Sequence, residues 1–92
     1  MKVDLSIQGY LNQFFDQSNY ELELREGATL ADLFAVIDSR FGTSVPKSIW
    51  SREKKQFRGP VLISIGEETV KDVEFRLTDG QQISVKRFII GG

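Results

Sequence analysis

The spacing of apolar residues changes period along this chain, and the change limits the folds that it can adopt. Apolar and polar residues alternate over residues 3–7 and again over residues 20–24, which is the pattern of a strand with one buried face. From residue 30 the apolar residues recur at every third or fourth position instead, which is the period of a helix with one apolar side. We therefore expect two strands followed by a helix. Residues 9–19 join the two strands, and we expect a hairpin whose connection contains a turn that packs on the core.

The predicted helix has recognisable ends. Thr29 is a favourable N-cap, and Asp32 three residues later completes a near capping box. Gly42 stands where many helices end with a residue in the left-handed conformation. The sequence therefore predicts a helix over residues 30–41. Its apolar stripe consists of Leu30, Leu33, Phe34, Ile37 and Phe41.

Strand patterns return in the second half of the chain. Residues 61–65 form a short apolar run between turn signals, which predicts a well-buried, central strand. Phe75 and Leu77 continue the core pattern, and we expect a short strand before the last one. The last strand is predicted from Gln82 to about Phe88, after a turn in which Gly80 adopts a positive φ.

The segment between the helix and the third strand, residues 43–59, has mixed character and is expected to form a loop. Pro46 can open a short helical turn there. Ile49 and Trp50 are interpreted as core residues, with contact to a partner as the alternative. The stretch Arg52 to Arg58 carries four basic residues and one acidic residue. It is interpreted first as solvated surface, then as a docking site for a partner, and least favourably as a nucleic-acid site.

These elements predict an α+β domain of the β-grasp (ubiquitin-like) class. One main helix covers one face of a mixed sheet, because strand, strand, helix, strand, short strand and strand follow one another. No repeat, low-complexity segment or linker interrupts the 92 residues. We therefore expect a single domain over residues 1–92, with residues 89–92 as a flexible, functional C-terminal tail.

The composition excludes several kinds of chemistry. The chain has no cysteine and no histidine, which removes Ser-His-Asp and Cys-His catalysis, disulfides and thiolate metal sites. A formal net charge of -1 provides no overall field that attracts nucleic acid or an anionic membrane. A chain of this size builds one small core and no deep catalytic cleft. We expect a cytoplasmic protein that is not an enzyme by itself and binds no cofactor or metal.

The last residues of the sequence, Gly91 and Gly92, suggest how such a chain can act. Glycine packs nothing, so a terminal pair is either an idle end or a probe that a partner can enclose as bare backbone. An extended segment from Phe88 to Gly92 reaches about 13–17 Å. Conversion of the Gly92 carboxylate to an acyl-adenylate supplies a leaving group for acyl transfer. Sulfur delivered to that adenylate leaves a thiocarboxylate, and no cysteine is needed in the carrier.

The sequence resembles the prokaryotic ubiquitin-like sulfur carriers, namely the small subunit of molybdopterin synthase and the thiazole-synthesis carrier. The resemblance rests on the order Leu77-Thr78-Asp79-Gly80, the strand Ile83 to Arg87, and the final Gly91-Gly92, and it covers essentially the whole chain. It implies that Gly92 carries the adenylate and then the thiocarboxylate, and that Gly91 lets the tail enter a partner's channel. The length of the segment between helix and third strand favours molybdenum-cofactor synthesis.

The resemblance also implies partners. A ubiquitin-activating-type adenylyltransferase uses ATP and Mg²⁺ to activate the chain, and a larger synthase subunit consumes the sulfur. The chain alone is then a monomer, and it works in a hetero-oligomer. Outward apolar side chains on the uncovered face of the sheet would recruit these proteins. The candidate partner-binding residues are Phe75, Leu77, Lys86, Arg87, Phe88, Ile89 and Ile90.

Other functions stay open at this point. The same activation chemistry serves thiazole (thiamine) or cysteine synthesis, and it serves a ubiquitin-like modifier in which Gly92 forms an isopeptide bond. A third interpretation is a β-grasp interaction module with an inert tail. If a longer precursor is cut after Gly92, a protease must act first.

Overall fold

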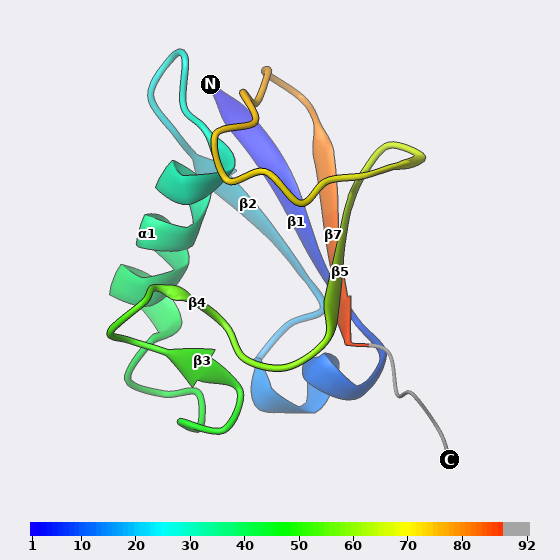
Figure 1. Cartoon of the computed structure of the whole chain (residues 1–92). Helices are drawn as coiled ribbons and strands as arrows, with labels where there is room; N and C mark the ends of the chain where they lie inside the picture. The colour runs from blue at the N-terminus through cyan, green and yellow to red at the C-terminus, as the bar shows by residue number, and fades with distance from the viewer. Residues whose placement is uncertain (88–92) are drawn as a thin grey trace.

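The computed structural model describes residues 1–87, which form a mixed five-stranded sheet with one helix across one face (Figure 1). The strands lie in the order β2-β1-β7-β5-β6. Strands β1 (Lys2–Gln8) and β7 (Gln82–Arg87) are parallel neighbours, and the other pairs are antiparallel. β2 spans Asn19–Glu23, β5 spans Val61–Ile65 and β6 spans Glu68–Thr69. The predicted α+β, β-grasp arrangement is confirmed.

The first hairpin forms as predicted. β1 and β2 pair in antiparallel register with Leu5 opposite Tyr20. Their connection contains a short 3-10 helix, η1 (Gly9–Phe14), and its Leu11 is fully buried. Leu11 therefore packs on the core as predicted, with Phe14 and Phe15 partly buried against it, whereas Tyr10 is exposed.

Helix α1 (Leu30–Phe41) begins and ends at the predicted residues. The Asp32 carboxylate accepts a hydrogen bond of 2.8 Å from the Thr29 backbone N–H, and the Thr29 hydroxyl accepts one of 3.4 Å from the Asp32 N–H. The prediction of a left-handed conformation at Gly42 is wrong, because its φ of -58° and ψ of -28° continue the helical conformation. Glycine is suited to this position for another reason. A Cβ there would press on the Asp38 carbonyl oxygen and come within 2.9 Å of the Asp38 carboxylate.

The core lies between α1 and the face of the sheet that it covers. Leu33 and Ile37 from the helix, Leu5 from β1, and Ile83 and Val85 from β7 are each at most 1% exposed. Burial of such a side chain contributes about 1.5–3 kcal/mol relative to an exposed position. The alternating pattern of the strands is therefore satisfied on this face.

The prediction that residues 61–65 form the central strand is wrong. The centre of the sheet is β7, which lies between β1 and β5, and β5 has only the two-residue β6 outside it. Val61 and Leu62 are accordingly only half-buried. Leu62 is paired with the exposed Lys86, so it lies on the uncovered face of the sheet.

The segment over residues 43–59 is more ordered than the predicted loop. It contains a small antiparallel hairpin of β3 (Trp50–Ser51) and β4 (Gln56–Phe57), which follows a turn that begins at Pro46. Figure 1 shows this hairpin beside the C-terminal end of α1. Ile49 and Trp50 are 1% and 2% exposed, which confirms the interpretation of both as core residues.

The short strand also differs in position from the prediction. β6 follows β5 through a turn at Gly66 and Glu67, whereas residues 75–77 form only an isolated bridge between Arg76 and Thr29. The predicted positive φ of Gly80 is confirmed, at 82°. Within residues 1–87, no helix has both the length and the apolar character that crossing a bilayer requires.

Candidate functional site

The end of β7 is the part of the predicted site that the structure describes. Lys86 and Arg87 are the last two described residues of the strand. Phe88, Ile89, Ile90, Gly91 and Gly92 lie outside the described residues. The geometry of the site is therefore that of the surface around Lys86 and Arg87, which we call the β7 end.

Arg87 is held in place by three neighbours. Its guanidinium carbon lies 5.6 Å from the centre of the Tyr10 ring, a cation–π contact. Its Nη2 donates a hydrogen bond of 3.3 Å to the Arg58 carbonyl oxygen. Gly59, at a φ of 83°, leaves room for the guanidinium, because a Cβ there would lie 3.0 Å from the Arg87 guanidinium carbon. Arg87 therefore links the 58–60 connection to the start of η1.

Tyr10 and Gly59 were not singled out from the sequence. Tyr10 is 41% exposed and stacks edge-on against Phe14, with ring centres 5.3 Å apart. The signal for Gly59 was its place before Pro60, which indicated a turn but not a close approach to Arg87. These contacts join residues far apart in sequence, and no local pattern reports them.

Phe75 and Leu77 lie at the opposite end of the sheet from Arg87. The Leu77 N–H donates to the Ala28 carbonyl at 2.8 Å, and the Phe75 carbonyl accepts from the Leu30 N–H at 2.9 Å. Both contacts place the pair beside the start of α1, at the far end of β7 from Arg87 (Figure 1). Leu77 is 3% exposed, which favours its core role over a docking role. The structure therefore does not bring these two residues together with Lys86 and Arg87.

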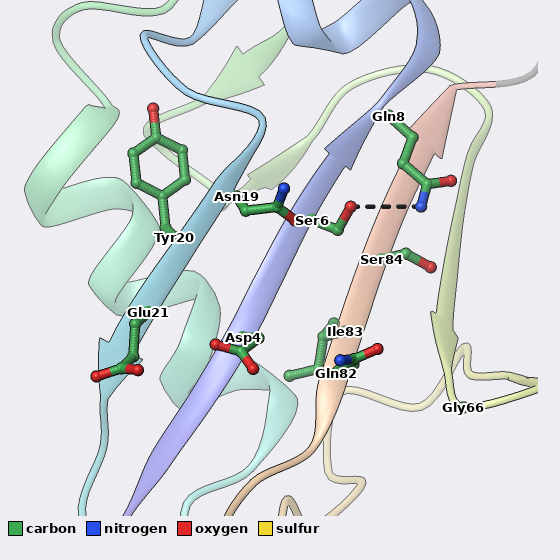
Figure 2. Close-up of a pocket in the computed structure, with 10 residues that line it drawn as sticks. All are labelled: Asp4, Ser6, Gln8, Asn19, Tyr20, Glu21, Gly66, Gln82, Ile83 and Ser84. Carbon is green, nitrogen blue, oxygen red and sulfur yellow. Dashed lines mark hydrogen bonds between the residues drawn. The ribbon is translucent and has the colours of Figure 1, made fainter.

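The uncovered face of the sheet is polar across β1, β2 and β7, although apolar side chains were predicted there. Figure 2 shows Asp4, Ser6, Gln82 and Ser84 on this face, which is hollowed into a shallow groove of about 530 Å³. Within the groove the Gln8 side-chain amide donates a hydrogen bond of 3.3 Å to the Ser6 hydroxyl. The expected apolar docking surface is therefore absent from these described strands. The alternation of the strands explains this, because every second residue is polar.

The carboxyl groups of the described residues show no arrangement for acid–base catalysis. The pKa of Asp38 is lowered chiefly by the hydrogen bond from the Trp50 indole and further by Arg52, and burial opposes the shift. The pKa of Asp32 is lowered chiefly by its hydrogen bond from the Thr29 backbone. Both carboxylates are thus stabilised as anions by structural contacts. A general acid at neutral pH would need a raised pKa instead. Among residues 1–87 no three acidic side chains gather as a metal site would require.

Comparison with known proteins places this geometry in a recognised fold. No model of a known protein family matches the chain, and no curated protein sequence does. Among solved structures, SAMP1 from Haloferax volcanii matches with a TM-score of 0.79 at 9% identity, over 100% of both chains. A putative molybdopterin converting factor, subunit 1, from Pyrococcus furiosus matches with a TM-score of 0.71 at 23% identity, over 96% of this chain and 98% of that one. A complex of subunits 1 and 2 of molybdopterin-converting factor from Helicobacter pylori provides a third match, at a TM-score of 0.65 and 20% identity over 100% of both chains.

These matches confirm the resemblance stated from the sequence at the level of the fold. The chain has the β-grasp fold of these matched structures, and each match extends over essentially its full length.

Proposed function

We propose that this chain is a ubiquitin-like sulfur carrier whose Gly92 is adenylated and then converted to a thiocarboxylate that donates sulfur. The observation that carries the proposal is the combination of the β-grasp fold with a Gly-Gly pair four residues beyond the central strand β7. Neither feature is sufficient alone, because the fold serves many functions and the motif is short. The proposal requires Gly92 to be the carboxyl end of the mature protein, either as translated or after cleavage.

The proposed chemistry proceeds in two steps on the Gly92 carboxylate. A carboxylate oxygen attacks the α-phosphorus of ATP in the activating enzyme, and pyrophosphate leaves. Hydrosulfide then attacks the carbonyl carbon, AMP leaves with its bonding electron pair, and a proton is released as the thiocarboxylate forms. ATP and Mg²⁺ belong to the partner enzyme. This chain supplies only the acyl group, so a carrier without cysteine or histidine fits the scheme.

We further propose molybdopterin synthesis as the pathway that receives the sulfur. Two of the matched structures are described as subunit 1 of a molybdopterin converting factor, and the Helicobacter pylori structure is a complex of that subunit with subunit 2. By analogy, the partners proposed for this chain are an adenylyltransferase and a larger synthase subunit. The carrier itself then has no catalytic activity.

A protein modifier is the second candidate function. The Haloferax volcanii protein is described as a small archaeal modifier protein, and its structure matches this chain with a TM-score of 0.79. A modifier uses the same adenylated glycine, but a lysine amine of the target protein attacks the carbonyl and an isopeptide bond forms.

The intact mass of the protein purified from its own host distinguishes these functions. A sulfur carrier gains the mass difference between sulfur and oxygen, located in the peptide that ends with Gly92. A modifier is recovered in higher-mass conjugates joined through Gly92. If the mass stays unmodified even with the host's adenylyltransferase and ATP, the proposed function is wrong.

The variant Gly91→Val tests whether the tail must be enclosed as bare backbone. A β-branched side chain next to Gly92 is expected to abolish adenylation, because a channel that fits glycine excludes it. The free energy of unfolding should change by less than about 0.5 kcal/mol. Ser39→Val is the matched control, since it adds the same side chain at an exposed position on α1. Adenylation of Gly91→Val at the wild-type rate would contradict the requirement.

A further inference from the structure

Charge is strongly segregated in this molecule although its net charge is only -1. Residues 40–58 and 86–87 together contain eight basic residues and one acidic residue, Glu53. The remainder of the chain contains four basic and twelve acidic residues. The basic segments lie at the C-terminal end of α1, in the β3–β4 hairpin and at the β7 end, which share the lower part of the molecule in Figure 1. One end of the sheet is therefore cationic.

The basic end contains a hollow of about 530 Å³ between the C-terminal end of α1 and the β3–β4 hairpin. Its lining includes the cations Lys47, Arg52 and Arg58, together with Glu53 and Trp50. We call it the basic hollow. A cavity of this size accommodates one or two side chains of another protein, and its cations outnumber its single carboxylate three to one.

One cation of the basic hollow is fixed in advance. The buried Asp38 carboxylate accepts a hydrogen bond of 2.8 Å from the Trp50 indole N–H and lies 3.5 Å from the Arg52 Nε. Arg52 therefore has a carboxylate partner, although its side chain is 54% exposed and can meet a second one. Lys47 and Arg58 take part in none of the ion pairs among residues 1–87. Their charges are available for a ligand from outside the described chain.

The basic hollow is coupled to the β7 end through Arg58. Arg58 lines the hollow, and its backbone carbonyl accepts the hydrogen bond from Arg87. A partner seated in the hollow would thus contact the residue that fixes the strand leading to Gly92.

The surroundings favour an acidic protein segment over nucleic acid as the occupant. Base stacking needs exposed aromatic faces, but Trp50 and Phe57 beside the hollow are 2% and 6% exposed. The Tyr10 ring at the β7 end is exposed, but it is already in contact with Arg87 and Phe14. An extended polyanion would also meet the rest of the chain, where acidic residues outnumber basic residues by twelve to four. A short acidic segment of a protein would contact only the cations of the basic hollow and would avoid these acidic residues.

We propose that the basic hollow docks an acidic segment of the enzyme that activates Gly92, through Lys47, Arg52 and Arg58. This inference rests on the proposed function for the identity of the partner. It replaces the uncovered sheet face, which is polar, as the surface that recruits that enzyme. Long-range attraction between unlike charges then raises the rate of encounter and orients the β7 end toward the active site.

The double variant Lys47→Glu/Arg58→Glu tests this surface in the adenylation reaction with the host's adenylyltransferase. Both side chains are exposed. The hydrogen bond from the Arg87 side chain is retained, because its acceptor is the backbone carbonyl of residue 58. The KM for the carrier is expected to rise by about tenfold or more, with kcat unchanged and a smaller effect at high salt. Lys71→Glu/Arg76→Glu makes the same charge change at two exposed positions outside the basic hollow, and its KM should stay within about twofold of the wild type.

Equal KM values for the test and control variants would overturn the inference while leaving adenylation of Gly92 intact. Absence of adenylation of the wild-type chain would instead contradict the proposed function. The docking surface would then be judged from titration of the ¹⁵N-labelled full chain with a heptaglutamate peptide. Shifts confined to residues 42–58 support the inference. Shifts elsewhere, or the same shifts produced more readily by inorganic phosphate or a single-stranded oligonucleotide, overturn it.

Discussion

The core under α1 and the basic end of the sheet are built from opposite kinds of residue. Under the helix, Leu33, Ile37 and Ile83 are at most 1% exposed and have no polar groups to satisfy beyond the backbone. At the basic end, Lys47 and Arg58 are exposed and take part in none of the ion pairs among residues 1–87. The difference indicates that stability and recognition are carried by separate parts of the molecule. Substitutions in one part should then leave the other property unchanged.

Leu33→Ala is expected to have the largest effect on stability. Leu33 is 0% exposed on the face of α1 that meets the sheet, so its loss leaves a cavity and costs about 2–5 kcal/mol in the free energy of unfolding. Urea titration measures this change. Ser39→Ala on the exposed face of the helix is the control and should stay within about 0.5 kcal/mol. A negligible cost for Leu33→Ala would mean that the helix does not pack as described. Ile37→Ala should behave like Leu33→Ala.

Asp38 stands where the two parts meet, and its ionisation should be visible in the pH dependence of stability. The Trp50 indole and Arg52 lower its pKa below the ordinary value of 3.8, so the ionised form stabilises the folded state. That contribution is complete above the unfolded pKa and is lost as the pH falls through the lower folded pKa. The unfolding midpoint of the wild type should therefore fall more steeply below about pH 4 than that of Asp38→Asn.

The pKa of Asp32 is lowered as well, by the Thr29 backbone, so Asp32→Asn is the matched comparison. It removes an acid-sensitive contribution at the start of α1 and leaves Asp38 untouched. Each single variant should lessen the fall of the unfolding midpoint at acid pH, and the double variant should lessen it further. If the unfolding midpoints of the wild type and Asp38→Asn fall equally at acid pH, the Trp50–Asp38–Arg52 contact is not formed in solution.

The smallest effects on stability are expected at the β7 end. Lys86 is exposed and should tolerate substitution by Gln within about 0.5 kcal/mol. Arg87→Gln loses the cation–π contact with the exposed Tyr10 ring, which contributes about 0.5–1 kcal/mol. Thermal unfolding measures both. A loss of unfolding free energy as large as that of Leu33→Ala would show that the β7 end belongs to the core. Stability and recognition would then not be carried by separate parts of the molecule.

Local patterns predicted the elements that local chemistry determines. β1, β2 and α1 were found because strict alternation, a helical stripe and the Thr29–Asp32 capping box each lie within a few residues. The order of the strands and the helix along the chain predicted the β-grasp arrangement that unites them. The places where prediction succeeded are therefore those in which periodicity and capping agree.

The errors concern contacts between distant segments. An apolar run at residues 61–65 does not reveal which strand lies at the centre, because strand order depends on the parallel pairing of β1 with β7. The β3–β4 hairpin has two-residue strands, too short for a period, and is held by the burial of Trp50. Gly42 was assigned a positive φ from its position, whereas its lack of a Cβ accommodates Asp38. The cluster of Tyr10, Gly59 and Arg87 joins three parts of the chain and has no sequence signature.

The central claim is that the acyl group of Gly92 is the working group of this protein. Its most direct test is mass spectrometry of the C-terminal peptide after incubation of the full chain with the host's adenylyltransferase, ATP, Mg²⁺ and a sulfide donor. The account predicts that sulfur replaces one oxygen at Gly92. It predicts no such product when one alanine is added after Gly92, although both proteins unfold at the same temperature. Sulfur located anywhere else, or equal sulfuration of the extended chain, would contradict the claim.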